Sequence, residues 1–291
     1  MKPLPSNDFR ARRLMLTDDD FAFSSGEYLG PTNLIDEATW NSIVSLPDDV
    51  SIRTSDRFGP QLRQVWRFWD LWNRVVGAVQ SLSNSSAESA TAIAACDASD
   101  EFQAGVYCSL VGHYRVAFSC LRNVLEQITI AAQLDIKADK RDFHDWRNAD
   151  ERIKFGWAAD MLPKNARLES LEEHLRVAVN DTLFDQNPKG FARRLFAELS
   201  KYAHGAAEFT DGDLRQSNGP IFVAEAFLGW CAVMFKTYLV CLHELKLAHP
   251  TLRDLPWGPP AMNLEQLRAE VTACVASEDQ DLAFFQALST F

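Results

Sequence analysis

The sequence predicts an all-α fold, namely an up-and-down helical bundle with an irregular N-terminal arm and short C-terminal helices. Apolar residues recur at three- and four-residue spacing along several segments, and no segment shows the alternation that is typical of β-strands. No internal repeat is visible, which argues against a solenoid. With 47% hydrophobic and 24% charged residues, the chain has the composition of a globular protein with a sizeable core.

We expect three parts along the chain: an arm over residues 1–60, a bundle over 61–250 and a helical extension over 251–291. The arm is rich in Pro, Gly, Asp and Ser, and one short helix is predicted in it over Asp36–Leu46. The Pro-rich stretch Asp254–Asn263 marks the start of the extension. We predict that the arm covers the main domain.

The bundle begins with a strongly amphipathic helix over Gln61–Leu82, whose apolar and Trp residues share one face that is expected to pack in the core. The low-complexity stretch Ser81–Ala90 is predicted to be a loop. Pro188 suits the first turn of a later helix, and Gly205 suits its end. The further predicted helices cover Val106–Leu134, Phe143–Leu162, Leu168–Phe184, Pro188–His204, Ile221–Ala248, Leu264–Ser277 and Glu278–Leu288.

Charge and cysteine content limit the class of protein. The net charge of −11 argues against a broad nucleic-acid or anionic-membrane surface, although one local basic site remains compatible with it. The six cysteines form no CxxC pair, which favours reduced thiols in the cytoplasm, and the N-terminus has no apolar segment of the signal-peptide type.

The longest apolar run extends over Ile221–Leu242, but Glu225 and Lys236 interrupt it. This pattern favours the buried central helix of a soluble bundle over a bilayer helix. We therefore expect a cytoplasmic protein without a membrane partner.

A polar stripe marks the helix predicted from Val106. Its residues follow one another at steps of three or four, so they share one helix face, and none of them is a lysine. They are Arg115, Ser119, Arg122, Glu126, Thr129 and Gln133. Arg122 and Glu126 can pair, and arginine suits a forked contact with a carboxylate or phosphate. The alternative is a half-exposed face with one helix ion pair.

A second polar group lies at the end of a helix, in LSKYAHG (Leu199–Gly205). His204 falls in the last turn, where the helix dipole favours imidazolium. The alternative is that His204 and Lys201 bind the final carbonyls, while Gly205 makes a left-handed turn.

The polar loop that follows His204 is long for a helix connection, and such loops are often functional. It contains Arg215 and Asn218. A metal site formed by His204 with the loop carboxylates lacks a recognised ligand pattern. We predict no metal and no cofactor.

The segments YRVAFSCLRNVLEQ and LSKYAHG together resemble those of a broad class of bacterial all-α proteins related to HEPN domains. Members of that class are bundles whose late helix ends near a histidine, and many belong to toxin–antitoxin, abortive-infection or phage-defence systems. Their active members are metal-independent ribonucleases that usually work as dimers. Their signature is an arginine followed by a histidine with about four to six residues between them, and the two side chains together serve phosphate binding and proton transfer.

This chain departs from that signature, because Leu199, Glu198 and Ala197 stand where the arginine should be. A composite site would need Arg115 or Arg122 from another helix. Our preferred hypothesis is a HEPN-like homodimer with a degenerate motif that binds RNA, a nucleotide or a protein partner in stress or phage defence. Its expected binding residues are Arg115, Ser119, Glu126, Ser200, Lys201, Tyr202, Arg215 and Asn218.

Two alternatives remain open. One is an active ribonuclease in which Arg122 holds phosphate and His204 acts as acid and base. The other is a non-catalytic scaffold that docks a partner through the Trp-rich helix from Gln61 or through the C-terminal LAFFQALSTF.

Overall fold

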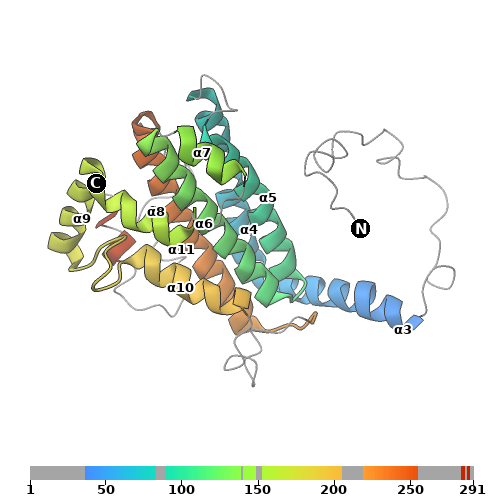
Figure 1. The fold of residues 1–291 in the computed structure, drawn as a ribbon. Coiled ribbons are helices and arrows are strands. Elements are labelled where there is room, and N and C mark those ends of the chain that lie inside the picture. Colours follow the sequence, from blue (N-terminus) through green and yellow to red (C-terminus); the bar gives the residue numbers. More distant parts are fainter. Residues whose placement is uncertain are drawn as a thin grey trace. The chain divides into compact units, whose positions relative to one another are not determined.

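The computed structural model describes residues 37–82, 89–138, 140–148, 153–204, 219–254, 283–285 and 287–288. Helices dominate these residues, and no β-strand occurs among them beyond an isolated bridge between Gln186 and Lys189. The helices of the main unit pack against one another around a shared hydrophobic core (Figure 1). The predicted all-α bundle is confirmed.

The chain divides into two compact units, Met1–Ser45 and Leu46–Phe291. In the first unit, α3 (Glu37–Trp40) continues into a short π-helix, η2 (Asn41–Ser45), close to the predicted short helix. The α-helices of the second unit are α4 (Leu46–Leu82), α5 (Ala90–Leu110), α6 (Tyr114–Lys137), α7 (Lys140–Arg147), α8 (Phe155–Met161), α9 (Ala166–Val179), α10 (Phe191–His204) and α11 (Ala224–Ala248). Its 3₁₀ helices are η3 (Leu162–Lys164) and η6 (Pro250–Asp254).

The range of α4 consists of two helical segments that meet at a kink, where Phe58 has non-helical backbone angles (φ −121°, ψ 27°). The second segment follows the kink with Pro60 near its start, close to the predicted start at Gln61, whereas the first segment, from Leu46, was not predicted as part of the bundle. The Phe58 ring is buried and stacks on Phe227 of α11, with 5.1 Å between the ring centroids. The predicted arm over 1–60 is therefore too long, because its last part belongs to the helical core.

Helices α5 and α6 replace the single helix predicted over Val106–Leu134, and most of α5 was not predicted at all. The break between them contains Gly112, whose φ of +85° lies in the region that favours glycine. The backbone of Ile221 crosses so close that a Cβ at Gly112 would lie 2.4 Å from the Ile221 oxygen. The two helices therefore turn back on each other and lie side by side (Figure 1).

Helix α9 ends at Val179 and not at Phe184 as predicted. The buried carboxylate of Glu172 accepts hydrogen bonds from the backbone N–H groups of Leu183 (2.6 Å) and Phe184 (2.8 Å). These bonds draw the chain back onto α9 and end the helix.

Helix α10 starts at Phe191, three residues after the predicted Pro188. The N–H of Phe191 donates to the carbonyl of Thr182 at 2.7 Å, so the first amides of α10 are tied to the preceding segment. In place of the single helix predicted over Phe143–Leu162, the structure has two helices, α7 and α8.

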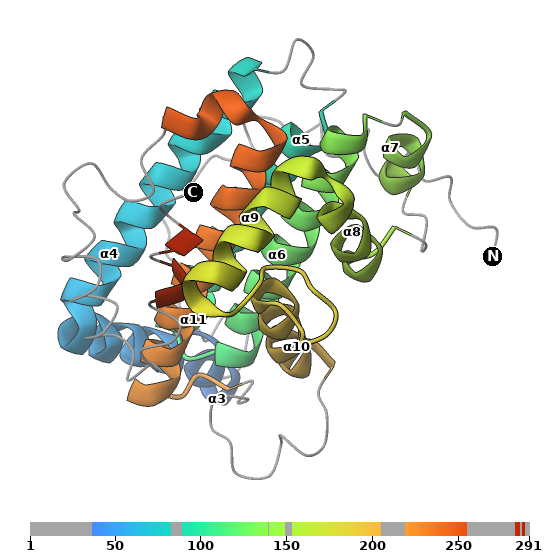
Figure 2. The ribbon, with the colours of Figure 1, turned by 90° about the vertical axis from the view of Figure 1, so that its left-hand side faces the viewer.

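Helix α11 is the central element of the core, and it lies against α4 and α6 (Figure 2). It matches the predicted helix over Ile221–Ala248 except that it starts three residues later. By length and composition it could cross a membrane, but 83% of its most apolar window is buried inside the protein. Such burial is expected of a core helix.

The C-terminal part is described only in places. The predicted helix over Leu264–Ser277 lies outside the described residues. At 283–285 the chain is helical, and Phe284 stacks on Phe191 of α10 with 4.5 Å between centroids. This contact attaches the end of the chain to the bundle.

A buried carboxyl group lies between α11 and α6. The Glu244 side chain is fully buried, and its Oε1 atom lies 2.9 Å from the Thr129 hydroxyl oxygen. Burial raises the pKa of Glu244 well above its usual range, so the folded protein holds this group neutral.

Relative to wild type, Glu244→Gln is expected to gain stability as the pH rises from 5 to 8, by up to about 1.4 kcal/mol for each pH unit over which only the unfolded state has released the Glu244 proton. The folded state keeps the Glu244 proton, whereas the unfolded state releases it as the pH rises above the ordinary carboxyl pKa. The wild type therefore becomes less stable as the pH rises. The glutamine variant does not titrate at this position, so it avoids that decrease. Urea unfolding at both pH values tests this, and equal differences at pH 5 and pH 8 would contradict it.

Candidate functional site

The two arginines of the α6 polar stripe contact the last turns of α10, whereas Thr129 of the same stripe contacts Glu244 of α11. Arg115 Nε donates to the carbonyl oxygen of Tyr202 at 2.9 Å. Two helical turns further along α6, Arg122 Nε donates to Ser200 Oγ at 3.3 Å. Two arginines of one helix thus contact the C-terminal end of the other.

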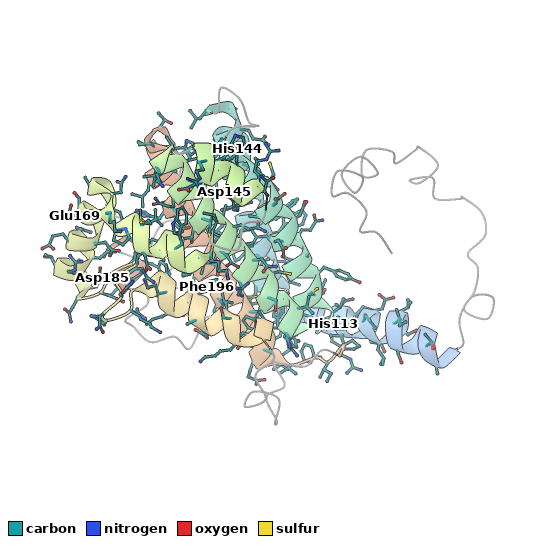
Figure 3. The ribbon with its side chains drawn as sticks, viewed as in Figure 1. His113, His144, Asp145, Glu169, Asp185 and Phe196 are labelled. Atoms are coloured by element: carbon teal, nitrogen blue, oxygen red, sulfur yellow. The ribbon has the colours of Figure 1, made fainter. Side chains whose placement is uncertain are left out.

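Arg122 is enclosed by three side chains. Its Nη1 lies 3.0 Å from Glu126 Oε2, and its guanidinium carbon lies over the Phe196 ring at 4.8 Å from the centroid. Phe155 of α8 stacks on the same Phe196 ring at 3.9 Å, with only 6° between the ring planes. Figure 3 marks Phe196 on α10. The arginine is held by an ion pair, a hydrogen bond and a cation–π contact.

The hydroxyl group of Ser200 orients this arrangement. Its Oγ donates to the carbonyl of Phe196 at 2.7 Å, so its lone pairs remain to accept the Arg122 N–H. The bonds of Arg122 use Nε and Nη1, and its Nη2 has no partner among the residues that the structure describes. The Arg122 and Glu126 side chains are 18% and 25% exposed, so water and small ions reach the edge of the group.

Arg115 has a second, structural task. The Tyr202 carbonyl, near the end of the described part of α10, accepts this hydrogen bond, so Arg115 ties α6 to the backbone of α10. The Tyr202 ring stacks on Phe118 of α6 at 4.2 Å. Ser119 donates to the carbonyl of Arg115 in its own helix and serves α6 rather than α10.

The structure thus brings together the predicted residues Arg115, Arg122, Glu126, Ser200 and Tyr202. Lys201 is exposed beside them. His204 is the last residue of α10, two positions after Tyr202, and its side chain lies outside the described part of the structure. Arg215 and Asn218 also lie outside the described residues.

Sequence reasoning missed the aromatic residues of the site, Phe196 and Phe155. Both occupy apolar positions of helices and carry no signal that separates them from other core residues. Helical periodicity predicts that Arg115 and Arg122 share one face of their helix, whereas the contact of that face with α10, and the ring beneath the Arg122 guanidinium, depend on which helices meet.

Sequence reasoning also missed a polar cluster around Asp135 of α6. Its carboxylate accepts hydrogen bonds from Ser89 Oγ (2.9 Å), from the N–H groups of Ala90 (2.9 Å) and Thr91 (3.0 Å), and from the Thr91 hydroxyl. His249 Nε2 lies 2.6 Å from the Thr91 hydroxyl oxygen and 3.6 Å from Asp135. His249, which belongs to no sequence motif, is therefore part of this cluster.

This cluster has the residue types of a relay, but the hydroxyl at its centre is not accessible. Thr91 is fully buried and cannot reach a substrate, although the edges of His249 and Asp135 are exposed. Asp135 instead satisfies the first amides of α5 and links that helix end to the ends of α6 and α11. The cluster is a joint between three helices.

Within the described ranges, no group of three or more His, Cys, Asp or Glu side chains is arranged to hold a metal ion. The described cysteines, which are Cys96, Cys108, Cys120, Cys231 and Cys241, are free thiols.

Comparison with protein-family models, with curated proteins and with solved structures finds no match to this chain. The similarity to HEPN domains therefore rests on the two sequence segments named above.

Proposed function

We propose that this chain is a HEPN-like protein with a degenerate motif that binds RNA through its phosphate groups, in the setting of bacterial stress or phage defence. One observation carries the proposal: Arg115 and Arg122 of α6 both contact the end of α10, the helix whose last residue is His204. The family signature has an arginine near a histidine, and the contact of Arg115 with the backbone of Tyr202, two positions before His204, is consistent with an arginine supplied by a neighbouring helix.

The chemistry of Arg122 supports a phosphate ligand. Guanidinium groups bind phosphate through two parallel N–H donors, and the cation–π contact with Phe196 orients this one. Because the net charge of the chain is −11, weak general attraction to RNA is not available to it. Binding should therefore depend on a few local contacts, and single substitutions should have large effects.

Arg122→Ala is expected to weaken binding of a fluorescein-labelled single-stranded oligouridylate about tenfold, and to reduce the salt dependence of binding by about one phosphate contact. Fluorescence anisotropy of the purified protein at two salt concentrations measures both. Unlabelled ATP as a competitor distinguishes RNA from a free nucleotide as the preferred source of the phosphate.

Arg74→Ala is the matched control. Arg74 also pairs with an acid four residues away, Asp70, but this pair lies on the exposed side of α4. The Arg74→Ala substitution removes one positive charge, as Arg122→Ala does, but on α4 and outside the candidate site. It should leave RNA binding unchanged. Equal losses in both variants, or no binding by the wild type, would refute the proposal.

The ribonuclease alternative is tested on the same mixtures. If the RNA is cut on incubation with wild type, and if Arg122→Ala and His204→Ala each abolish the cutting, the composite site is catalytic. Induced expression in a bacterial host with inspection of total RNA extends the test to cellular RNA. Intact RNA together with binding that depends on Arg122 supports the non-catalytic form.

A further inference from the structure

We infer that Glu126 is an internal competitor for the Arg122 guanidinium, and that a phosphate group of the ligand must displace it. This inference rests on the proposed function. It assigns to Glu126 the opposite role to the one expected for a ligand-binding residue, because its carboxylate holds the position that phosphate would take.

The ion pair between Arg122 and Glu126 can be broken at little cost, which would uncover the guanidinium. Glu126 lies one turn from Arg122 on the same helix, with 3.0 Å between Nη1 and Oε2. Pairs of this kind on a helix are weak, because water competes for both partners. At 25% exposure the Glu126 side chain can rotate toward solvent without any change in the backbone.

The arginine, in contrast, would stay in place when Glu126 leaves. Its contacts with Ser200 and the Phe196 ring come from α10 and do not involve the carboxylate. Departure of Glu126 would free Nη1 beside Nη2, which has no partner among the described residues, and these two donors form a fork for phosphate oxygens. The site is therefore preorganised apart from its cover.

The same contacts indicate that phosphate, rather than a base, is recognised at Arg122. Phe155 stacks at 3.9 Å on the Phe196 ring, and Arg122 lies over that ring at 4.8 Å. Two groups so close to one centroid cannot share a face, so both faces are occupied. No base can stack on Phe196, and contact at this point should be independent of RNA sequence.

Glu126→Gln tests the inference, because glutamine keeps the size of the side chain and removes its charge. We expect the variant to bind the fluorescein-labelled oligouridylate about five- to tenfold more tightly than wild type at low salt. An oligoadenylate should show the same gain. The double variant Arg122→Ala with Glu126→Gln should lose the gain, since the carboxylate acts only through the arginine.

Glu173→Gln provides the control for net charge. Glu173 pairs with Arg176 on the exposed side of α9, at 3.2 Å, and its replacement changes the net charge by the same amount. Binding by Glu126→Gln that equals or falls below that of wild type would overturn the inference, as would an equal gain in Glu173→Gln or a gain that survives loss of Arg122. In those cases the proposed function stands if wild-type binding still depends on Arg122. Absence of binding by both wild type and Glu126→Gln would overturn both proposals.

Discussion

Asp135→Ala is expected to lower the free energy of unfolding by about 3 kcal/mol at pH 7. The substitution removes the acceptor for the N–H groups of Ala90 and Thr91 and for two hydroxyl groups. These donors lie at the N-terminal end of helix α5. Thr91 has no exposed surface, so water cannot replace the lost acceptor there. His249 loses its carboxylate neighbour at the same time.

The effect should depend on pH. Burial alone would raise the pKa of Asp135, but the neighbouring His249 and hydrogen bonds from Thr91 and Ala90 outweigh burial and lower the pKa below its ordinary value. A carboxyl group with a lowered folded pKa contributes stability above its unfolded pKa and loses that contribution as the pH falls through the folded pKa. The difference between wild type and Asp135→Ala should therefore shrink below about pH 4.

Urea unfolding followed by circular dichroism at neutral and acidic pH measures this difference. Asp70→Ala is the control, because the Asp70–Arg74 pair has side chains that are 56% and 60% exposed. Such pairs contribute at most about 0.5–1 kcal/mol. If the two variants lose equal stability at pH 7, or if the loss in Asp135→Ala does not diminish in acid, the joint is not what holds these helix ends.

The α6 stripe was predictable from the sequence because a helix preserves periodicity. Steps of three and four residues keep Arg115 and Arg122 on one face wherever the helix lies, and that face meets α10. The described part of α10 reaches His204, where the sequence predicts the helix end because Gly205 follows. Each half of the candidate site is thus visible in a local pattern, but the contact between the halves is not.

Several helix ends were not predictable, because distant groups determine them. Glu172 accepts hydrogen bonds from two backbone amides in the loop after α9, and these bonds end the helix. The backbone of Ile221 lies so close to position 112 that only glycine fits there. His249 meets Thr91 across a separation of 158 residues. A single sequence holds no record of such pairs, so its local apolar pattern joined α5 to α6 and left His249 without a role.

Gly112→Ala is expected to lower the free energy of unfolding by about 3 kcal/mol. The φ of +85° is unfavourable for any residue with a Cβ, and a Cβ there would lie 2.4 Å and 2.6 Å from the oxygen and nitrogen of Ile221. Both are backbone atoms, so no rotamer change relieves the overlap. Either the turn between α5 and α6 or the chain entering α11 must move.

A shift of either segment would also disturb a nearby hydrogen bond, in which the N–H of Val223 donates to the Tyr114 hydroxyl at 3.1 Å. Gly77→Ala is the matched control, since Gly77 lies in helix α4 with no atom within 4 Å of the added Cβ. That change should leave stability unchanged or raise it by up to about 1 kcal/mol. Urea unfolding midpoints compare the two variants. Similar midpoints would mean that the Ile221 backbone yields easily, and the turn between α5 and α6 would then owe its position to the packing of the helices and not to the glycine.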